Sequence, residues 1–238
     1  STDWAILNHA QALVPLADRL PHDNALGWVL HHDAGFKVDA SQYSAASQAD
    51  IDTPADLLLL EGHPNLGSGL REFLAGAPAQ CLNRVRALRE VLRTPAKTLA
   101  VIGRSSSHVW KELESRTEVW VRLFVEERGM VASGRATRGE VQSLVGMMLE
   151  AWGPQPFIAA LASMADAVIW DTRVWMSHRG LWPSMADRFA ADLGWVDEIQ
   201  EPPLRALTQA IVEAPIPIIT GGHGAVSGSL HAFLETLG

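Results

Sequence analysis

The chain has 238 residues, of which 47% are hydrophobic and 19% charged, and its formal net charge is −8. This length and apolar content suit a folded core and exclude a disordered chain. A net negative protein repels nucleic-acid phosphates and anionic lipid, and no apolar run approaches the ~20 residues needed to span a bilayer. We therefore expect neither nucleic acid nor a membrane as a partner.

The cysteine content bears on the compartment. Cys81 is the only cysteine, so no intrachain disulfide can form, which fits a reducing environment. No basic stretch followed by an apolar core is visible at the start of the sequence, so no signal peptide is predicted. From these two observations we expect a cytoplasmic protein.

The first 55 residues predict small elements outside the main core. Apolar residues recur at about 3.6-residue spacing over 3–20 and predict a helix. Two apolar stretches flank a turn at Asp33–Gly35, so residues 26–38 predict a β-hairpin. Residues 39–55 are polar and rich in Ser and Ala, which is typical of a connecting loop.

From residue 56 onward, strand and helix patterns alternate. Short apolar runs at 57–60, 98–102, 167–170 and 216–219 predict strands buried on both faces, and a period of two predicts another strand at 119–126. Helical patterns occur around 70–74 and at 79–93, 105–115, 184–194, 202–212 and 226–237. A capping-box pattern at Thr137–Glu140 predicts a further helix that runs to Trp152.

This alternation predicts an α/β fold. We expect a doubly wound, mostly parallel sheet of about five strands, with helices on both faces. No linker divides the chain, so residues 1–238 are interpreted as a single domain, in which 1–55 decorate a β-α core formed by 56–238.

Ligands of open parallel sheets bind beyond the carboxyl ends of the strands, and four loops are predicted there. Each loop contains a histidine, and three combine Gly with Ser just before a helix. The candidate acid–base residues are His63, His108, His178, His223 and Asp171. The candidate ligand-binding residues are Glu61, Gly103, Arg104, Ser105, Ser106, Ser107, Arg173, Arg179, Gly221, Gly222, Gly224 and Ser227.

These residue types favour a small anion. Glycine lets backbone N–H groups approach a ligand, serine hydroxyls donate hydrogen bonds, and a helix N-terminus carries partial positive charge. Arginine can form bidentate hydrogen bonds to a phosphate or carboxylate group. For any one loop, however, the ordinary turn and capping roles of Gly and Ser explain the composition better than a ligand does, and only its recurrence in three loops favours an anion site.

Several sharper signatures are missing. The run from Gly222 to Gly228 resembles a dinucleotide fingerprint with one extra residue, but no later strand could supply the acidic ribose contact. A phosphate-loop lysine, a Gly-x-Ser-x-Gly elbow and paired metal-ligand spacing are all absent.

The cofactor stays unknown and no metal site is predicted, although a site built from His63, His108, His178, His223 and Asp171 could arise by convergence in space. His31 and His32 point to opposite faces of the expected hairpin, which disfavours joint ligation.

Three functions remain open from the sequence. The first is an enzyme that binds a phosphorylated or carboxylated metabolite and uses histidine as general acid or base. The second is a non-catalytic ligand-binding or accessory protein with the same pocket. The third is a subunit of a homo- or hetero-oligomer, for which the nine tryptophans and Gly146–Met148 could supply a contact face, although core packing explains them more simply.

Overall fold

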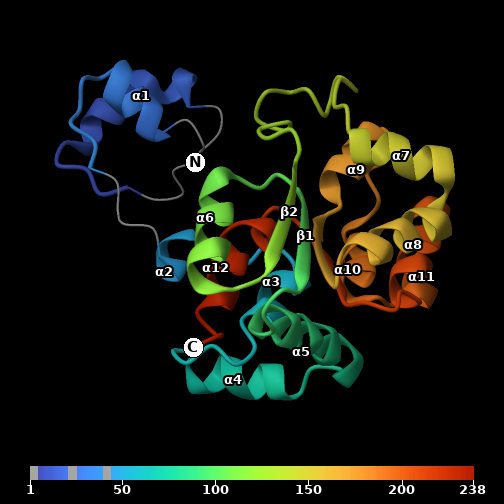
Figure 1. Ribbon diagram of the computed structural model, residues 1–238. Coiled ribbons are helices and arrows are strands. Elements are labelled where there is room, and N and C mark those ends of the chain that lie inside the picture. Colours follow the sequence, from blue (N-terminus) through green and yellow to red (C-terminus); the bar gives the residue numbers. More distant parts are fainter. Residues whose placement is uncertain (1–4, 21–25, 40–43) are drawn as a thin grey trace.

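The computed structural model describes residues 5–20, 26–39 and 44–238, and these form an α/β fold around a parallel sheet (Figure 1). The four strands are β1 (Thr98–Gly103), β2 (Trp120–Val125), β3 (Ala167–Asp171) and β4 (Ile218–Gly221). Their order in the sheet is β2-β1-β3-β4, and all three neighbouring pairs are parallel. The prediction of an α/β fold with a parallel sheet is therefore confirmed.

The order in which strands are added to the sheet reverses between β1 and β3. It leaves β1 for the edge strand β2 and then crosses back over β1 to reach β3 and β4. Val101 pairs with Leu123 of β2 on one side and with Ile169 of β3 on the other. Crossovers of this kind leave a crevice beyond the carboxyl ends of the two strands where the order reverses, here β1 and β3.

Two apolar clusters form the core, one against each face of the sheet. Alternation along β1 separates them, because Leu99 and Val101 join one cluster while Ala100 and Ile102 join the other. The first cluster packs against α3 (Pro54–Leu59), α5 (Ala79–Arg93), α6 (Ser107–Arg116) and α12 (Gly228–Leu234). The second packs against α7 (Leu144–Trp152), α8 (Pro154–Met164), α10 (Met185–Leu193) and α11 (Pro202–Val212), which lie together in Figure 1.

The remaining helices are shorter or lie at the margins. They are α1 (Leu26–His32), α2 (Ala45–Gln48), α4 (Ser68–Ala75) and α9 (Arg173–His178), with 3-10 helices at Ala10–Arg19, Val196–Glu198 and Gly224–Val226. Within the described ranges, no helix combines the length and apolar character that crossing a membrane requires.

The predicted strand at 57–60 is wrong, and with it the count of about five strands for the described residues. This run lies in helix α3, which begins at Pro54. Thr53 and Asp56 form a reciprocal capping box, and proline is well suited to the first position of a helix. These start signals outweigh the apolar run, which resembles a buried strand only when it is considered alone.

The N-terminal elements also differ from expectation. The predicted hairpin at 26–38 is wrong, because Leu26–His32 is helix α1. Its buried residues Val29 and Leu30 are adjacent, whereas a strand would turn them to opposite faces. In place of the helix predicted at 3–20, the structure has a 3-10 helix at Ala10–Arg19 with no buried residue and with Pro15 inside it; residues 1–4 lie outside the described part.

The capping box predicted at Thr137–Glu140 does not begin a helix. Glu140 instead forms an ion pair with Arg138, with 2.8 Å between Nε and Oε1. Helix α7 begins at Leu144, after Ser143, whose hydroxyl accepts a hydrogen bond from the Gly146 amide at 2.8 Å. The helices predicted at 79–93, 184–194 and 202–212 match α5, α10 and α11 within a residue at each end.

Candidate functional site

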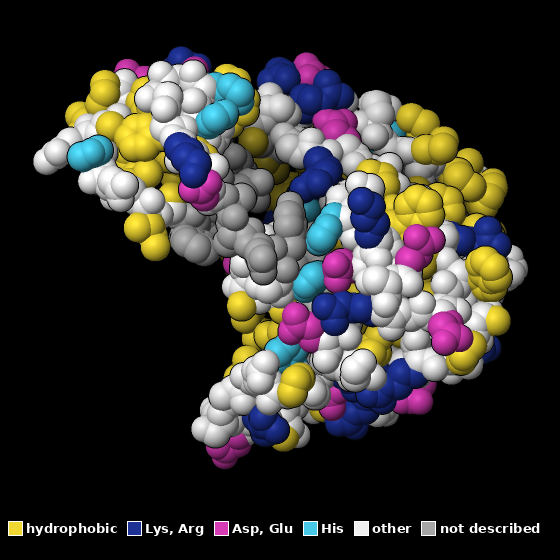
Figure 2. Space-filling model, turned by 60° about the vertical axis from the view of Figure 1, so that its left-hand side comes forward, with side chains coloured by type: hydrophobic (Ala, Val, Ile, Leu, Met, Phe, Trp, Pro, Cys, Tyr) yellow, Lys and Arg dark blue, Asp and Glu magenta, His cyan; other side chains and the backbone are white. Residues whose placement is uncertain are grey.

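A wide cleft of about 1310 Å³ lies beside the carboxyl edge of the sheet. The loop after β1, the loop after β4 and helices α6, α10 and α12 line it, together with parts of the N-terminal segment. In Figure 2 the molecule is hollowed on this side, and histidine, arginine and carboxylate side chains gather along the hollow. The protein as a whole is acidic, so this gathering of basic groups is a local feature.

The ends of β1 and β3 meet through a buried ion pair. Arg104 directs its Nε to Asp171 Oδ2 at 2.6 Å and its Nη2 to Oδ1 at 3.2 Å, and the Asp171 side chain is completely buried. Gly103 adopts a φ of +125°, and a Cβ there would come within 2.5 Å of the Asp171 Cβ. The close approach of these two strand ends therefore depends on a residue without a side chain.

A second buried pair lies next to the first. Arg173 contacts Asp192 through two hydrogen bonds of 2.9 and 2.6 Å. Burial alone would lower the pKa of Arg173, but the charge and hydrogen bonds of Asp192 raise it above its ordinary value. Arg173 therefore stays cationic while it forms part of the cleft lining. We call Gly103, Arg104, Asp171, Arg173 and Asp192 the floor of the cleft.

Two further arginines line the cleft without a carboxylate partner. Neither Arg128 nor Arg188 forms a hydrogen bond or ion pair with any residue in the described ranges, and the buried Nη1 of Arg188 lacks a hydrogen-bond partner there. The Arg188 guanidinium lies 4.9 Å from the centroid of the Trp182 ring. Burial lowers the pKa of Arg188, and the nearby charge of Arg173 lowers it further, against the charge of Asp192.

His223 follows β4 and also lines the cleft. Its Nε2 is buried and has no hydrogen-bond partner among the described residues. Burial lowers the pKa of His223, and the charges of Arg104 and Arg128 act in the same direction, against Asp171. The imidazole is therefore neutral near pH 7 and can accept a proton. We call Arg128, Arg188 and His223 the wall of the cleft.

The loop that carries His223 packs against the Asp56 side chain of α3. The Asp56 carboxylate is buried and accepts hydrogen bonds from the Thr53 amide at 2.8 Å and from the Ser229 hydroxyl at 2.7 Å. A Cβ on Gly224 would come within 2.3 Å of Asp56 Oδ1. Glycine at this position therefore allows the loop to lie directly on the carboxylate.

Glu126 follows the edge strand β2 and adds a carboxyl group at this end of the sheet. One carboxylate oxygen, Oε1, contacts the Ser143 hydroxyl, while the buried Oε2 has no hydrogen-bond partner in the part of the chain that the structure describes. Burial raises the pKa of Glu126, and repulsion from Asp171 adds to the shift despite the contact with Ser143. This carboxyl therefore binds a proton more readily than an exposed glutamate does.

Three of the four predicted loops meet at the cleft. Arg104, Ser106, His108, Arg173, Gly222, His223, Gly224 and Ser227 all line it. Ser105 is buried and donates a hydrogen bond to the Val226 carbonyl at 3.0 Å, which ties the loop after β1 to the loop after β4. Ser106 caps α6, and Ser107 is exposed in its first turn. Gly221 ends β4 and packs against Ala55 and Ala225.

The fourth loop lies elsewhere, because the segment before it is helix α3 and not a strand. Glu61 forms ion pairs with Arg89 at 2.7 Å and Arg86 at 3.1 Å, and His63 contacts Glu235 at 3.0 Å. Burial would raise the pKa of Glu61, but the two arginines hold it below its ordinary value. Neither Glu61 nor His63 lines the cleft.

His178 and Arg179 also lie away from the cleft lining. They end helix α9 and face α7, where Arg179 contacts Glu150 at 3.2 Å and the His178 ring lies close to Gly146. Helix α9 separates them from the end of β3, so they lie away from the strand end.

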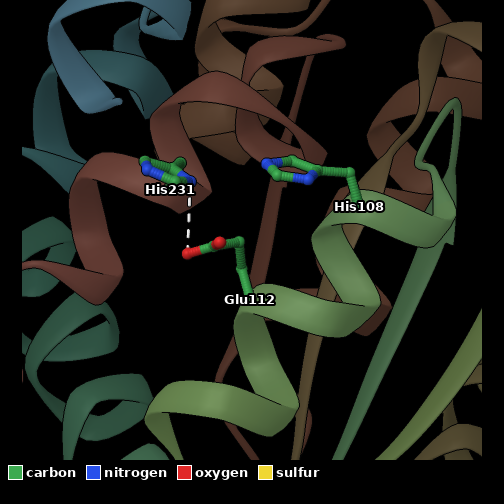
Figure 3. A group of neighbouring side chains, drawn as sticks. All are labelled: His108, Glu112 and His231. Carbon is green, nitrogen blue, oxygen red and sulfur yellow. Dashed lines mark ion pairs between the residues drawn. The ribbon is translucent and has the colours of Figure 1, made fainter. Parts of the chain in front are cut away.

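A group of three side chains lines the cleft from α6 and α12, and of these the sequence predicted only His108 as a candidate site residue. His108, Glu112 and His231 bring ligand-type atoms within 4.8 Å of one another (Figure 3). His108 and Glu112 project from the same face of α6 toward His231 on α12. The spacing of His108 and Glu112 within the predicted helix was a usable signal, because residues four apart share a helix face. No sequence signal identified Arg128, Arg188 or His231.

No protein-family model, curated protein or solved structure matches the chain. The function therefore has to be inferred from the geometry of the cleft.

Proposed function

We propose that this protein is an enzyme that binds a phosphorylated or carboxylated small molecule in the cleft and uses His223 as general base or acid. The observation that carries the proposal is the composition of the wall. Arg128 and Arg188 line the cleft without a carboxylate partner among the described residues, and the same cleft is lined by a neutral histidine with an unpartnered Nε2 on which the charge of Arg128 acts.

The charges of the wall explain the preference for an anion. A buried guanidinium nitrogen without a hydrogen-bond partner is unfavourable, and an oxyanion supplies the missing acceptor. Arg104 and Arg173 add positive potential from the floor, although their carboxylate partners neutralise part of it. A phosphate or carboxylate group bound in the cleft at Arg128 or at Arg188 would supply a counter-ion that the described residues do not provide.

The neutral His223 supplies the chemistry. In the neutral form one ring nitrogen carries a lone pair, which can accept a proton from water or from a substrate hydroxyl. The protonated ring would then sit near Arg104 and Arg128, which disfavour the charged form and promote return of the proton to a leaving group. Proton transfer by a positioned side chain of this kind contributes about 10²–10⁴-fold to a rate.

Anion binding is tested first, with inorganic phosphate and citrate as probes in isothermal titration calorimetry. Loss of a charged hydrogen-bond donor removes about 1.5–3 kcal/mol, so Arg188→Gln is expected to weaken binding about tenfold or more. The matched control is Arg179→Gln, which removes an arginine that contacts Glu150 outside the cleft and should leave affinity unchanged. Equal affinities in all three proteins would exclude the anion site.

Turnover is tested with a panel of phosphate monoesters, phosphoanhydrides and carboxylate esters. His223→Ala is expected to lower the rate by about 10²–10⁴-fold while phosphate binding persists. If the wild-type protein binds phosphate or citrate but converts no member of the panel, the non-catalytic ligand-binding function is favoured instead. Retention of full activity by His223→Ala would remove the assigned role of His223.

Assembly with a second copy or another protein is a second candidate function. Helix α7 presents Leu144, Met147 and Trp152 with exposed fractions of 72%, 43% and 48%. Exposed apolar side chains grouped on one helix are a common feature of contact surfaces. Light scattering over a range of concentrations tests this candidate, and a Met147→Glu variant should reduce any self-association that is observed.

A further inference from the structure

We propose that His108, Glu112 and His231 bind a divalent transition-metal ion of the zinc type at the side of the cleft formed by α6 and α12. The three side chains come from two helices that pack against each other, and their ligand-type atoms lie within 4.8 Å of one another. The inference is independent of the anion site, because different residues carry it.

The donor set matches zinc chemistry. Two imidazoles and one carboxylate form a ligand set typical of zinc, with metal–ligand distances of about 2.0–2.2 Å. Tetrahedral coordination at these distances places neighbouring ligand atoms about 3.4 Å apart. His231 Nδ1 already lies 3.7 Å from Glu112 Oε2, and the rings of His108 and His231 are nearly parallel at 14° with centroids 6.1 Å apart. Small side-chain rotations would therefore bring the donors to bonding distance.

A second layer of residues is arranged to hold His231 in the orientation that a metal requires. Its Nδ1 faces Glu112, while its Nε2 faces Glu235 Oε1 at 4.0 Å. Metal-bound histidines commonly donate their second ring N–H to a carboxylate, which fixes the ring and increases its basicity. The other oxygen of Glu235 contacts His63 at 3.0 Å, so Oε1 is the oxygen that faces His231.

Arg116 is a neighbour that opposes the metal. Its Nε lies 3.0 Å from Glu112 Oε2, so it shares the carboxylate and adds positive charge near the site. The other oxygen, Oε1, has no contact of this kind with a described residue. A metal ion could therefore bind Oε1, or displace the Arg116 side chain, which is 40% exposed.

The position of the three residues predicts an accessible metal. Structural zinc sites usually have four protein ligands, whereas catalytic sites have three and leave one position open. All three residues line the cleft, so the open position would face its interior. There a metal could bind water or an oxygen of the ligand, and its charge would strengthen attraction for an anion.

Zinc binding is measured by calorimetry with zinc alone, after chelator treatment of the intact chain. We expect one zinc ion per chain, with a loss of affinity of about 100-fold or more in His108→Ala and His231→Ala. Glu235→Gln should weaken binding about 10–100-fold through His231. Arg116→Gln should strengthen binding, because it removes a competing positive charge. Two matched controls are expected to bind zinc normally: His223→Ala, which lies in the same cleft, and His32→Ala on α1.

Cobalt substitution gives a readout that does not depend on the variants. A tetrahedral site with nitrogen and oxygen donors should give intense visible absorption bands in the wild-type protein. Glu112→Gln, a nearly isosteric change, provides a test in which the fold is preserved. Failure of the wild-type chain to bind zinc would overturn the proposal, as would unchanged zinc affinity in folded His108→Ala and Glu112→Gln variants. Loss of zinc binding with intact phosphate binding would separate this site from the anion site.

Discussion

The floor and the wall of the cleft contain the same residue type, arginine, in opposite situations. On the floor, Arg104 and Arg173 each form two hydrogen bonds to a completely buried aspartate. On the wall, Arg128 and Arg188 have no carboxylate partner among the described residues. The floor charges are satisfied within the protein and fix its shape, whereas the wall charges are available to a molecule from outside.

This contrast has an energetic basis. Breaking a buried ion pair from one side leaves an uncompensated charge, which destabilises a protein strongly. Removing a charge that never had a partner relieves repulsion and desolvation. Substitutions of floor arginines are therefore expected to destabilise the protein strongly and those of wall arginines hardly at all, and this difference tests the division into floor and wall.

The largest effect is expected on the floor, at Arg173. Replacing Arg173 by Met should lower the free energy of unfolding by about 3–5 kcal/mol, because Asp192 would remain buried without its partner. Urea denaturation measures the change. In the double variant Arg173→Met, Asp192→Leu, both charges are gone and much of the stability should return. A double variant that is as unstable as the single one would show that packing, and not the lone charge, explains the loss.

A smaller loss is expected where the two central strands end. Gly103→Ala should lower the free energy of unfolding by about 2–4 kcal/mol, since it combines backbone strain at φ +125° with a clash at 2.5 Å from the Asp171 Cβ. Gly180→Ala is the matched control, because Gly180 has a φ of +62° with no atom within 4 Å of an added Cβ. It should lose only about 1 kcal/mol. Similar losses in both variants would indicate that the contact with Asp171 is unimportant.

Substitution on the wall should cause little or no loss of stability. Arg188→Gln is expected to change the free energy of unfolding by less than about 0.5 kcal/mol, or to raise it, because the charge lies near Arg173 without a carboxylate partner. The same urea titration measures this, beside the loss of phosphate affinity already described. Destabilisation comparable to that of Arg173→Met would place Arg188 with the floor residues.

The sequence predicted the sheet better than the cleft. Strands β1 and β3 are buried on both faces, which gives continuous apolar runs in the sequence. Strand β2 is partly buried on one face only, which gives a period of two. Both patterns identify a strand from the sequence alone. The run at 57–60 was misassigned because four apolar residues fit a strand and a short helix equally well. The Thr53–Asp56 capping box and Pro54 distinguish them, and both lie just before the run.

The convergence of Arg104, Asp171 and His223 was predictable once three strands had been identified, because parallel strands end at the same edge. Arg188, in contrast, reaches the cleft from the middle of α10, and His231 from α12. Their positions depend on how helices pack over the sheet, which no local pattern encodes. The same packing brings His231 to the α6 residues His108 and Glu112.

The smallest predicted effect is the contribution of His223, a wall residue, to the pH dependence of the free energy of unfolding. The surroundings of His223 are Arg104 from the end of β1, Arg128 from the segment after β2 and Asp171 from the end of β3. Burial and the two arginines lower the pKa of His223 below the ordinary value of 6.5. The unfolded chain therefore binds this proton more readily than the folded protein does.

The sign of the pH dependence follows from this difference. Above pH 6.5 the histidine is largely neutral in both states and contributes little to the change of stability with pH. As the pH falls through 6.5 toward the lower folded pKa, the unfolded state gains the proton first, so the free energy of unfolding decreases. His223→Gln should remove this contribution and flatten the profile. Subtracting the two profiles cancels other titrating groups, among them His231, whose pKa burial also lowers. The expected difference, wild type minus His223→Gln, decreases toward acid pH. A difference that is level, or that rises toward acid pH, would mean that His223 is more accessible to protons in the folded protein than its burial beside two arginines allows.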